Sequence, residues 1–169
     1  MRVLKEGERH RVRFTLNDEP VEGLAEPRML LTDFIRHEIG ATGTHVGCEH
    51  GICGACTIRV DGKAVRACLM LAVQAEGKRL ETIEGLAAKD GTLSTLQLAF
   101  HRNFALQCGY CTPGFLLMAT QLLDRYPDPD EDQIRHYLSG NLCRCAAYPE
   151  IINAVKIAAR KHKVVSQSR

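Results

Sequence analysis

The sequence predicts an α+β protein built as a strand-rich roll followed by a bundle of helices. Three observations lead to this fold class. Short alternating segments between turn residues occupy residues 11–83, apolar residues at helical spacing follow from about residue 90, and the eight cysteines divide into four in each part. We therefore expect a first domain at residues 1–84, a linker at 85–89 and a second domain at 90–169.

Strands and one helix are expected in the first domain. The strands share apolar–polar alternation between turn residues. The first is expected at Arg11–Leu16, and a short second strand follows the turn at 17–20. Further strands are expected at Thr57–Val60, Lys63–Arg66 and Arg79–Ile83. Asp61-Gly62 between two of them is a type I′ hairpin signal. Apolar side chains at helical spacing predict a helix over Met29–Ile39, which Gly40 ends. Together these elements predict a small α+β roll.

Four helices with brief connections are expected in the second domain, which is the pattern of a four-helix bundle. Their expected positions are Leu93–Phe104, Thr112 to about Tyr126, from the 128–131 segment to Ser139, and from Pro149 onward. Thr92 and Thr112 are expected to cap the first two helices, with Pro113 at a first helical position. The segment 128–131, Asp-Pro-Asp-Glu, resembles a capping box with its proline at the first helical position.

Composition and charge exclude several classes of protein. The formal net charge is only +2, whereas a nucleic-acid-binding surface needs clustered basic residues, so we expect no nucleic-acid partner. No run approaches the ~20 apolar residues of a membrane span, and the basic start lacks the apolar core of a secretory signal. We therefore expect a cytoplasmic protein. In a reducing compartment, closely spaced cysteines are metal ligands more often than disulfides.

The first quartet of cysteines has the spacing of a plant-type [2Fe–2S] site. It consists of Cys48, Cys53, Cys56 and Cys68. The C-x4-C-x2-C pattern with a distant fourth cysteine is typical of that cluster, and glycines at 43, 47, 51 and 54 suit a loop that approaches it closely. Zinc is the main alternative, although zinc sites usually combine two short cysteine pairs. A Rieske cluster needs two histidine ligands and is rejected; His50 and His45 are expected to be ordinary polar loop residues.

The second quartet is less diagnostic by spacing alone. It consists of Cys108, Cys111, Cys143 and Cys145. Cys111 directly precedes one expected helix start and Cys145 shortly precedes another, and helix N-termini favour thiolates and anionic clusters. A thioredoxin-type dithiol at Cys108 and Cys111 is the alternative, but it lacks the expected βαβ context and leaves two cysteines unexplained.

Four motifs, in this order, span nearly the whole chain. They are Gly47–Cys56, Arg66–Cys68, Gln107–Phe115 and Gly140–Cys145. Their combination resembles the small iron–sulfur subunit of molybdenum hydroxylases, the xanthine oxidase family that includes bacterial carbon monoxide dehydrogenase and N-heterocycle hydroxylases. The resemblance implies a β-grasp ferredoxin-like domain followed by a four-helix domain, with one [2Fe–2S] cluster held by each cysteine quartet.

The resemblance also implies partners and cofactors outside this chain. A large subunit would oxidise the substrate at a molybdenum–pterin cofactor of the cytosine dinucleotide form, and a medium subunit would carry FAD. The assembly is expected to be a heterotrimer that can dimerise. Gln107 matches a glutamine that contacts the pterin in similar proteins, and Cys145 matches a cluster ligand close to it.

One short segment departs from the pattern of the family. After Cys145 the family commonly has Thr-Gly-Tyr, whereas this chain has Ala146-Ala147-Tyr148. The replacements remove a hydroxyl and a glycine that permits an unusual φ. All four ligands remain, so we expect the change to affect only the local fit against the pterin or the large subunit.

The expected function is that of an electron-transfer subunit of an oxidoreductase. Electrons would pass one at a time from the molybdenum–pterin site through the two clusters toward the flavin subunit. The chain is expected to hold no catalytic residue and no substrate site, so carbon monoxide, purines, N-heterocycles and aldehydes all stay open as substrates. A free two-cluster ferredoxin and a zinc-stabilised adaptor are the alternatives.

Overall fold

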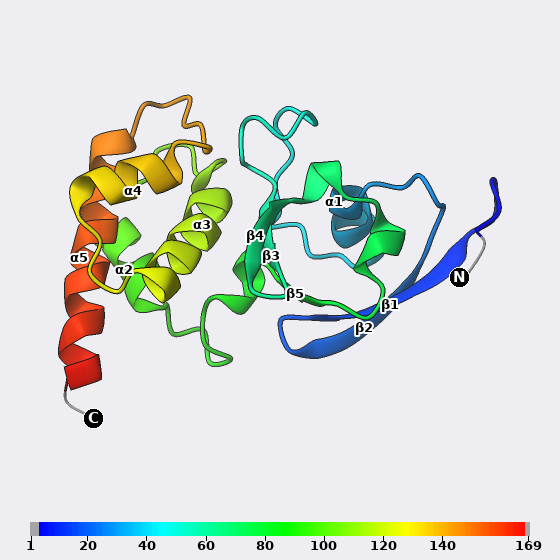
Figure 1. Ribbon diagram of the computed structural model, residues 1–169, viewed down its shortest axis with the longest axis horizontal. Coiled ribbons are helices and arrows are strands. Elements are labelled where there is room, and N and C mark those ends of the chain that lie inside the picture. Colours follow the sequence, from blue (N-terminus) through cyan, green and yellow to red (C-terminus); the bar gives the residue numbers. More distant parts are fainter. Residues whose placement is uncertain (1–3, 168–169) are drawn as a thin grey trace.

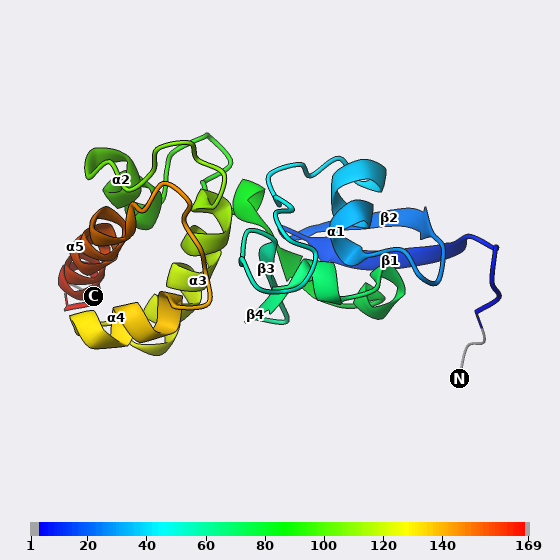
Figure 2. The ribbon, with the colours of Figure 1, turned by 90° about the horizontal axis from the view of Figure 1, so that it is seen from above.

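A computed structural model describes residues 4–167 of the protein, with side chains up to residue 160. The chain forms a sheet-containing domain and a helical domain that lie side by side along the longest axis (Figure 1). The view from above shows the same separation (Figure 2). Each domain has its own cluster of buried apolar side chains, so each builds a separate core. The predicted α+β class is confirmed.

Five strands form one mixed sheet in the first domain. In chain order they are β1 His10–Leu16, β2 Glu19–Ala25, β3 Thr57–Val60, β4 Lys63–Arg66 and β5 Arg79–Glu81. Their spatial order is β2-β1-β5-β3-β4, in which only the β1–β5 pair is parallel. The predicted hairpin between β3 and β4 is confirmed, because Asp61 and Gly62 at its tip both have positive φ. Positive φ at Asn17 and Asp18 makes the same kind of turn between β1 and β2.

A helix covers the sheet of the first domain, as predicted, but it is irregular. It consists of α1, Leu31–Asp33, followed by a π-helical turn at Phe34–Glu38. Phe34 is fully buried and its ring lies 5.9 Å from that of Phe14 on β1, which fixes the helix against the sheet. Short 3-10 turns complete the domain at Ala67–Leu69, Ala72–Ala75 and Ile83–Gly85.

Four helices form the second domain, as predicted. They are α2 Thr95–Arg102, α3 Thr112–Arg125, α4 Glu131–Leu138 and α5 Tyr148–Gln167. No helix within residues 4–167 is long and apolar enough to cross a membrane.

Three of the predicted helix caps are wrong by a few residues. Ser94, not Thr92, caps α2, because it forms a reciprocal capping box with Gln97. Asp130 caps α4 in the same way with Gln133, which leaves Pro129 outside the helix. Thr112 is the first residue of α3 rather than its cap.

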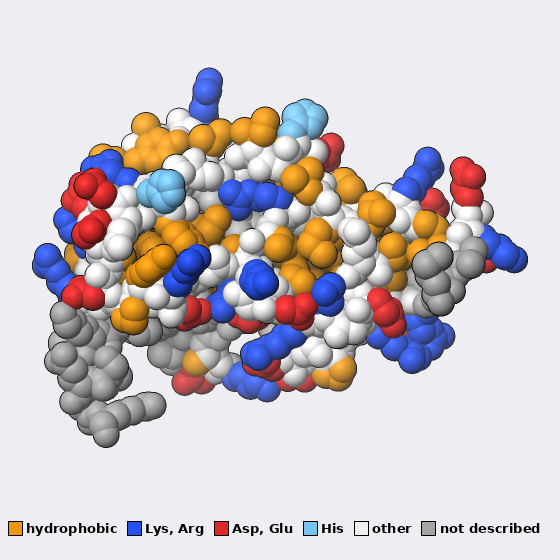
Figure 3. Space-filling view, in the orientation of Figure 1, with side chains coloured by type: hydrophobic (Ala, Val, Ile, Leu, Met, Phe, Trp, Pro, Cys, Tyr) orange, Lys and Arg blue, Asp and Glu red, His pale blue; other side chains and the backbone are white. Residues whose placement is uncertain are grey.

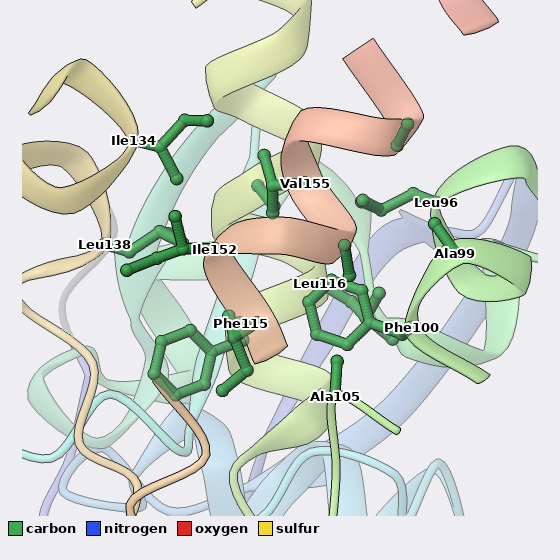
Figure 4. Packing of buried hydrophobic residues seen from close by; sticks show 14 of the residues in the cluster. Leu96, Ala99, Phe100, Ala105, Phe115, Leu116, Ile134, Leu138, Ile152 and Val155 are labelled. Atoms are coloured by element: carbon green, nitrogen blue, oxygen red, sulfur yellow. The ribbon is translucent and has the colours of Figure 1, made fainter. Parts of the chain in front are cut away.

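The core of the helical domain fills the space between its helices. Figure 4 shows Phe100, Phe115, Ile134 and Val155 pointing toward one another from α2, α3, α4 and α5. Each of the four is buried to 1% exposure or less. Burial of an apolar side chain of this size contributes about 1.5–3 kcal/mol, so this cluster holds the helices together and positions their ends.

The two domains meet through polar contacts, one of them buried, as well as packing. Asn141, only 2% exposed, donates from Nδ2 to the Gly54 carbonyl at 3.1 Å. Arg66 of β4 donates to the Gly140 carbonyl at 2.6 Å and to the Asn141 Oδ1 at 3.3 Å. Arg59 of β3 forms an ion pair with Asp124 of α3 at 2.9 Å. These contacts connect the first domain to both α3 and the segment after α4.

Asn141→Ala should lower the free energy of unfolding by about 1–2 kcal/mol, because it removes a buried hydrogen bond to the Gly54 carbonyl and a second one from Arg66, while both groups keep their other partners. Urea unfolding of the purified protein measures this change. Asn153→Ala is the matched control, since Asn153 makes only an exposed side-chain contact at 3.4 Å. An equal loss in both variants would contradict the importance assigned to the domain junction.

Candidate metal centres

Three cysteines of the first quartet lie in one loop beside the sheet, residues 43–56, which is here called the cysteine loop. Cys48 and Cys53 lie in this loop and are half-buried, and Cys56 lies buried at its end, directly before β3. Cys68 lies buried in the 3-10 turn after β4, which pairs with β3. The hairpin therefore brings the distant fourth cysteine to the loop that carries the other three.

Backbone N–H groups of the cysteine loop point at the Cys48 sulfur. The N–H groups of Cys53 and His50 each donate to Cys48 Sγ at 3.4 Å. These donors lower the pKa of the Cys48 thiol to about 6, because they stabilise the thiolate. Burial has the opposite effect on Cys56 and raises the pKa of its thiol to about 11. The loop thus supplies donors to a negatively charged sulfur on its exposed side.

The second quartet lies where three helices begin or end. Cys111 occupies the cap position of α3, and Cys108 precedes it by one turn of chain. Cys143 and Cys145 lie between α4 and α5, where the Cys143 N–H donates to the Tyr148 hydroxyl at 2.9 Å. The N-terminus of the fourteen-residue helix α3 directs positive partial charge toward this quartet, as predicted.

The thiols of the second quartet differ in the same way as those of the first. The Tyr110 N–H lowers the pKa of the exposed Cys108 thiol. Burial raises the pKa of the Cys111 thiol to about 12. Each quartet therefore combines a thiol stabilised as thiolate by backbone donors with a less exposed thiol, buried Cys56 or half-buried Cys111, that favours its proton until a positive charge is bound.

Within each quartet the sulfurs associate in pairs. Cys48 interacts with Cys53 and Cys56 with Cys68, while Cys108 interacts with Cys145 and Cys111 with Cys143. The pairs of one quartet are neighbours, because Cys53 also acts on Cys56 and Cys108 on Cys111. Among the side chains of residues 4–160, no three from His, Cys, Asp or Glu converge closely enough to hold one metal ion. Two neighbouring pairs of thiols fit a dinuclear cluster, in which each iron takes two protein ligands.

Cysteines from both quartets line a common cavity of about 360 Å³. Its walls include Cys53 of the first quartet and Cys108, Cys111 and Cys143 of the second, with Tyr110 and Leu142 between them. Both cysteine-bearing segments lie at the same end of the molecule, at the top of Figure 1. The fold therefore brings cysteines of two groups that are distant in the sequence to the walls of one cavity.

Backbone-to-backbone contact holds the cysteine loop against the helical domain. A Cβ added to Gly114 of α3 would overlap the carbonyl oxygen of Gly54, and one added to Gly54 would come within 2.8 Å of the Gly140 carbonyl oxygen. The Leu142 N–H donates to the Cys53 carbonyl at 2.8 Å. Only glycine allows so close an approach at positions 54 and 114, and the result is a direct hydrogen bond between segments of the two quartets.

The remaining residues singled out in the sequence have mixed outcomes. Gln107 is exposed and donates to the Cys145 carbonyl at 3.3 Å, so the two residues expected near a pterin lie together. His50 contributes its backbone N–H to Cys48. His45 is more than a polar loop residue, because its ring stacks on Tyr110 of the helical domain at 4.7 Å. Nothing local in the sequence indicates this contact, since the two residues are far apart in the chain.

The departure after Cys145 falls differently from the expectation. The residue with positive φ is Ala146, at +61°, and not Ala147, which stands where the common Thr-Gly-Tyr motif has its glycine. Ala147 is 1% exposed and belongs to the core of the helical domain. The chain therefore carries a methyl group in a left-handed conformation one residue after Cys145.

Fold and sites together define a protein of the [2Fe–2S]-binding class. Two protein families match the chain, one described as a 2Fe–2S iron–sulfur cluster binding domain over residues 28–93 and one as a [2Fe–2S] binding domain over residues 82–156. These ranges contain the first and the second quartet respectively.

Named relatives narrow this class. The caffeine dehydrogenase gamma subunit of Pseudomonas sp. strain CBB1 is 53% identical over 150 residues, covering 87% of this chain and 89% of that subunit. The nicotine 6-hydroxylase small subunit of Paenarthrobacter nicotinovorans is 52% identical over 130 residues, covering 77% and 78%.

Solved structures agree. A chain of quinoline 2-oxidoreductase from Pseudomonas putida 86 superposes with a TM-score of 0.89 at 46% identity, covering 94% of this chain and 98% of that one. The aldehyde oxidoreductase of Desulfovibrio desulfuricans matches with a TM-score of 0.87 at 37% identity, and the match covers 92% of this chain but only 17% of that protein. The chain belongs to the family of small iron–sulfur subunits of molybdenum hydroxylases.

Ala146→Gly should raise the free energy of unfolding by about 0.5–1 kcal/mol, because the left-handed conformation costs a non-glycine residue about 1–2 kcal/mol and glycine's added chain entropy cancels only part of this. Thermal or urea unfolding measures the effect. Ala147→Gly is the matched control and should lower stability instead, since it removes a buried methyl group. Equal effects in the two variants would contradict the strain assigned to Ala146.

Proposed function

We propose that this chain is the electron-transfer subunit of a heteromeric molybdenum-containing hydroxylase or dehydrogenase. The observation that carries the proposal is the hydrogen bond between the two cysteine-bearing segments, from the Leu142 N–H to the Cys53 carbonyl. Such a contact suits a protein whose two metal sites must exchange electrons. Each cluster, when bound, accepts and releases one electron at a time.

The ligand assignment follows the pairs of thiols. In the first domain, Cys48 and Cys53 would share one iron, and Cys56 and Cys68 the other. In the helical domain the pairs would be Cys108 with Cys145 and Cys111 with Cys143. Neighbouring thiols support these pairs, and the N–H donors to Cys48 and Cys108 would stabilise an anionic cluster.

A direction for the electrons follows from what surrounds each quartet. Gln107 and Cys145 lie together on an exposed surface of the helical domain, where they would contact the molybdenum–pterin of a large subunit, in its cytosine dinucleotide form. From the second quartet the route would continue through Cys143, Leu142 and the Cys53 carbonyl to the first quartet. The first quartet would then face a medium subunit that holds FAD.

Exposed apolar side chains beside both quartets support partner subunits on both sides. Ile52 and Leu69, next to the first quartet, are 64% and 63% exposed, and Phe104, before the second quartet, is 80% exposed with a positive φ. Figure 3 shows apolar side chains gathered along the upper edge of the molecule over the helical domain. Apolar groups at this exposure are typical of surfaces that another protein covers. A heterotrimer, with further dimerisation of the assembly, fits these surfaces.

The role of this chain in the reaction would be to hold the two clusters, to separate them from solvent and to connect them for electron transfer. Its backbone donors and buried walls would set the potentials of the clusters, while the substrate would be oxidised on the large subunit. The alternative, a free two-cluster ferredoxin, would also use both quartets. It differs in needing no permanent partner.

Cys53→Ser should remove the cluster of the first domain and leave the EPR signal of the helical-domain cluster, because the two quartets use separate ligands. Cys111→Ser should do the reverse. Iron and sulfide analysis of the intact protein should give about four of each per chain, and about two in each variant. Loss of both signals in a folded single variant would contradict two independent quartets, and a colourless protein with zinc would contradict the function as a whole.

Purification of the tagged chain from its native host should recover two larger subunits, one containing molybdenum and one containing FAD. The expectation rests on the exposed apolar side chains at both quartets. Metal analysis and absorption spectra of the recovered complex measure it, and an Ile52→Asp variant should retain less of the flavin subunit than a Leu24→Asp control, which alters an exposed leucine on β2. Recovery of the native chain alone, with both clusters, would favour the free ferredoxin.

A further inference from the structure

Tyr110 connects the two quartets through contacts that cluster binding alone does not require. It lies between Cys108 and Cys111, and its backbone N–H acts on the Cys108 sulfur. Its hydroxyl crosses to the first domain and donates to the Val46 carbonyl at 2.6 Å. Val46 lies two residues before Cys48. Tyr110 therefore contacts both a thiol of the second quartet and the cysteine loop that carries the first.

His45 completes this contact from the other side. Its ring stacks on the Tyr110 ring with 4.7 Å between centroids and 21° between planes. Its Nδ1 lies 2.8 Å from the Tyr110 carbonyl. Because a carbonyl only accepts, Nδ1 carries the proton and donates here. The pair His45–Tyr110 is called the clasp below.

The clasp attaches the half of the cysteine loop that the main domain junction does not reach. The junction holds the later half, through the Cys53 carbonyl and the Gly54 carbonyl, to the segment before Cys143. The clasp holds the earlier half, residues 45–46, to the segment between Cys108 and Cys111. Each half of the loop is thus tied to a different cysteine-bearing segment of the helical domain.

Stability alone does not account for this arrangement. The Tyr110 side chain is part of a residue that is 49% exposed, so its burial contributes little compared with the fully buried contacts of Asn141. Its contacts nevertheless converge on the two segments whose relative position sets the distance between the quartets. The rate of electron tunnelling falls steeply with distance. A small displacement of the earlier half of the cysteine loop, which leads into Cys48, would therefore change the rate of electron exchange between the clusters.

We propose that His45 and Tyr110 are positioning residues that fix the two clusters relative to each other for electron transfer. This proposal rests on the function proposed above, with one [2Fe–2S] cluster in each quartet. The clasp takes no part in the redox step itself. It holds the earlier half of the cysteine loop, next to Cys48, and it orients the N–H that Tyr110 directs at Cys108.

The test uses the native complex with three variants. Tyr110→Phe keeps the ring and loses only the hydroxyl bond to Val46, His45→Ala loses the stack and the Nδ1–H bond, and the double variant loses both. Tyr126→Phe and His136→Ala are the matched controls, because both residues are exposed in the helical domain and neither lines the cavity that the cysteines share. Iron content and thermal unfolding show that each variant keeps its clusters and its fold.

The decisive readouts are the magnetic interaction between the two reduced clusters in EPR, their midpoint potentials, and the rate of electron exchange between them after flash reduction. We expect the interaction to weaken and the exchange to slow several-fold in His45→Ala, with a smaller effect in Tyr110→Phe and a non-additive effect in the double variant. The controls should match the unmodified protein.

The outcomes separate the two proposals. If the variants unfold at lower temperature but keep the magnetic interaction, the potentials and the exchange rate, the clasp is merely structural and the positioning role is overturned. If His45→Ala fails to assemble, the isosteric Tyr110→Phe decides by the same readouts. If the unmodified complex itself lacks two cluster signals, the proposed function fails, and the positioning role with it.

Discussion

Close backbone contact between the cysteine loop and the helical domain is the constraint on which the rest of the structure depends. Gly54 and Gly114 meet without side chains, and this lets the Leu142 N–H reach the Cys53 carbonyl. A methyl group at either glycine would push the domains apart, because packed backbones yield little. The spacing of the two quartets therefore follows from the absence of two Cβ atoms, and the polar contacts of Asn141 and Arg66 stabilise that spacing.

The electrostatics of the cysteines follow from the same arrangement. In each domain a more exposed thiol receives backbone N–H donors, while a buried partner has a raised pKa. The donors come from loops that cannot be regular structure, and the start of α3 adds its dipole. Both devices favour a negatively charged cluster, and Arg144 lines the cavity beside the second quartet. Other charged side chains connect domains and strands, as Arg59 does with Asp124 and Glu81.

The accuracy of the sequence predictions differs between elements for physical reasons. Strands and the β3–β4 hairpin were predictable because alternation and the Asp61-Gly62 turn are local properties. The caps of α2 and α4 were misplaced although a local signal exists, since Ser94 and Asp130 each have a glutamine three residues later. The π-helical turn at Phe34–Glu38 has no such signal, because packing of Phe34 on the sheet selects it.

The sequence by itself determined the chemistry of this protein. The spacing of eight cysteines, the glycines among them and the motif order are written in the chain, because ligand type and loop conformation depend on local residues. Only the tertiary structure decided which thiols lie together in pairs, that Cys53 of the first quartet lines one cavity with cysteines of the second, and that His45 stacks on Tyr110. It also decided that the left-handed residue is Ala146. These features depend on how two separately folded domains meet, and contacts between residues so distant in the chain leave no local pattern.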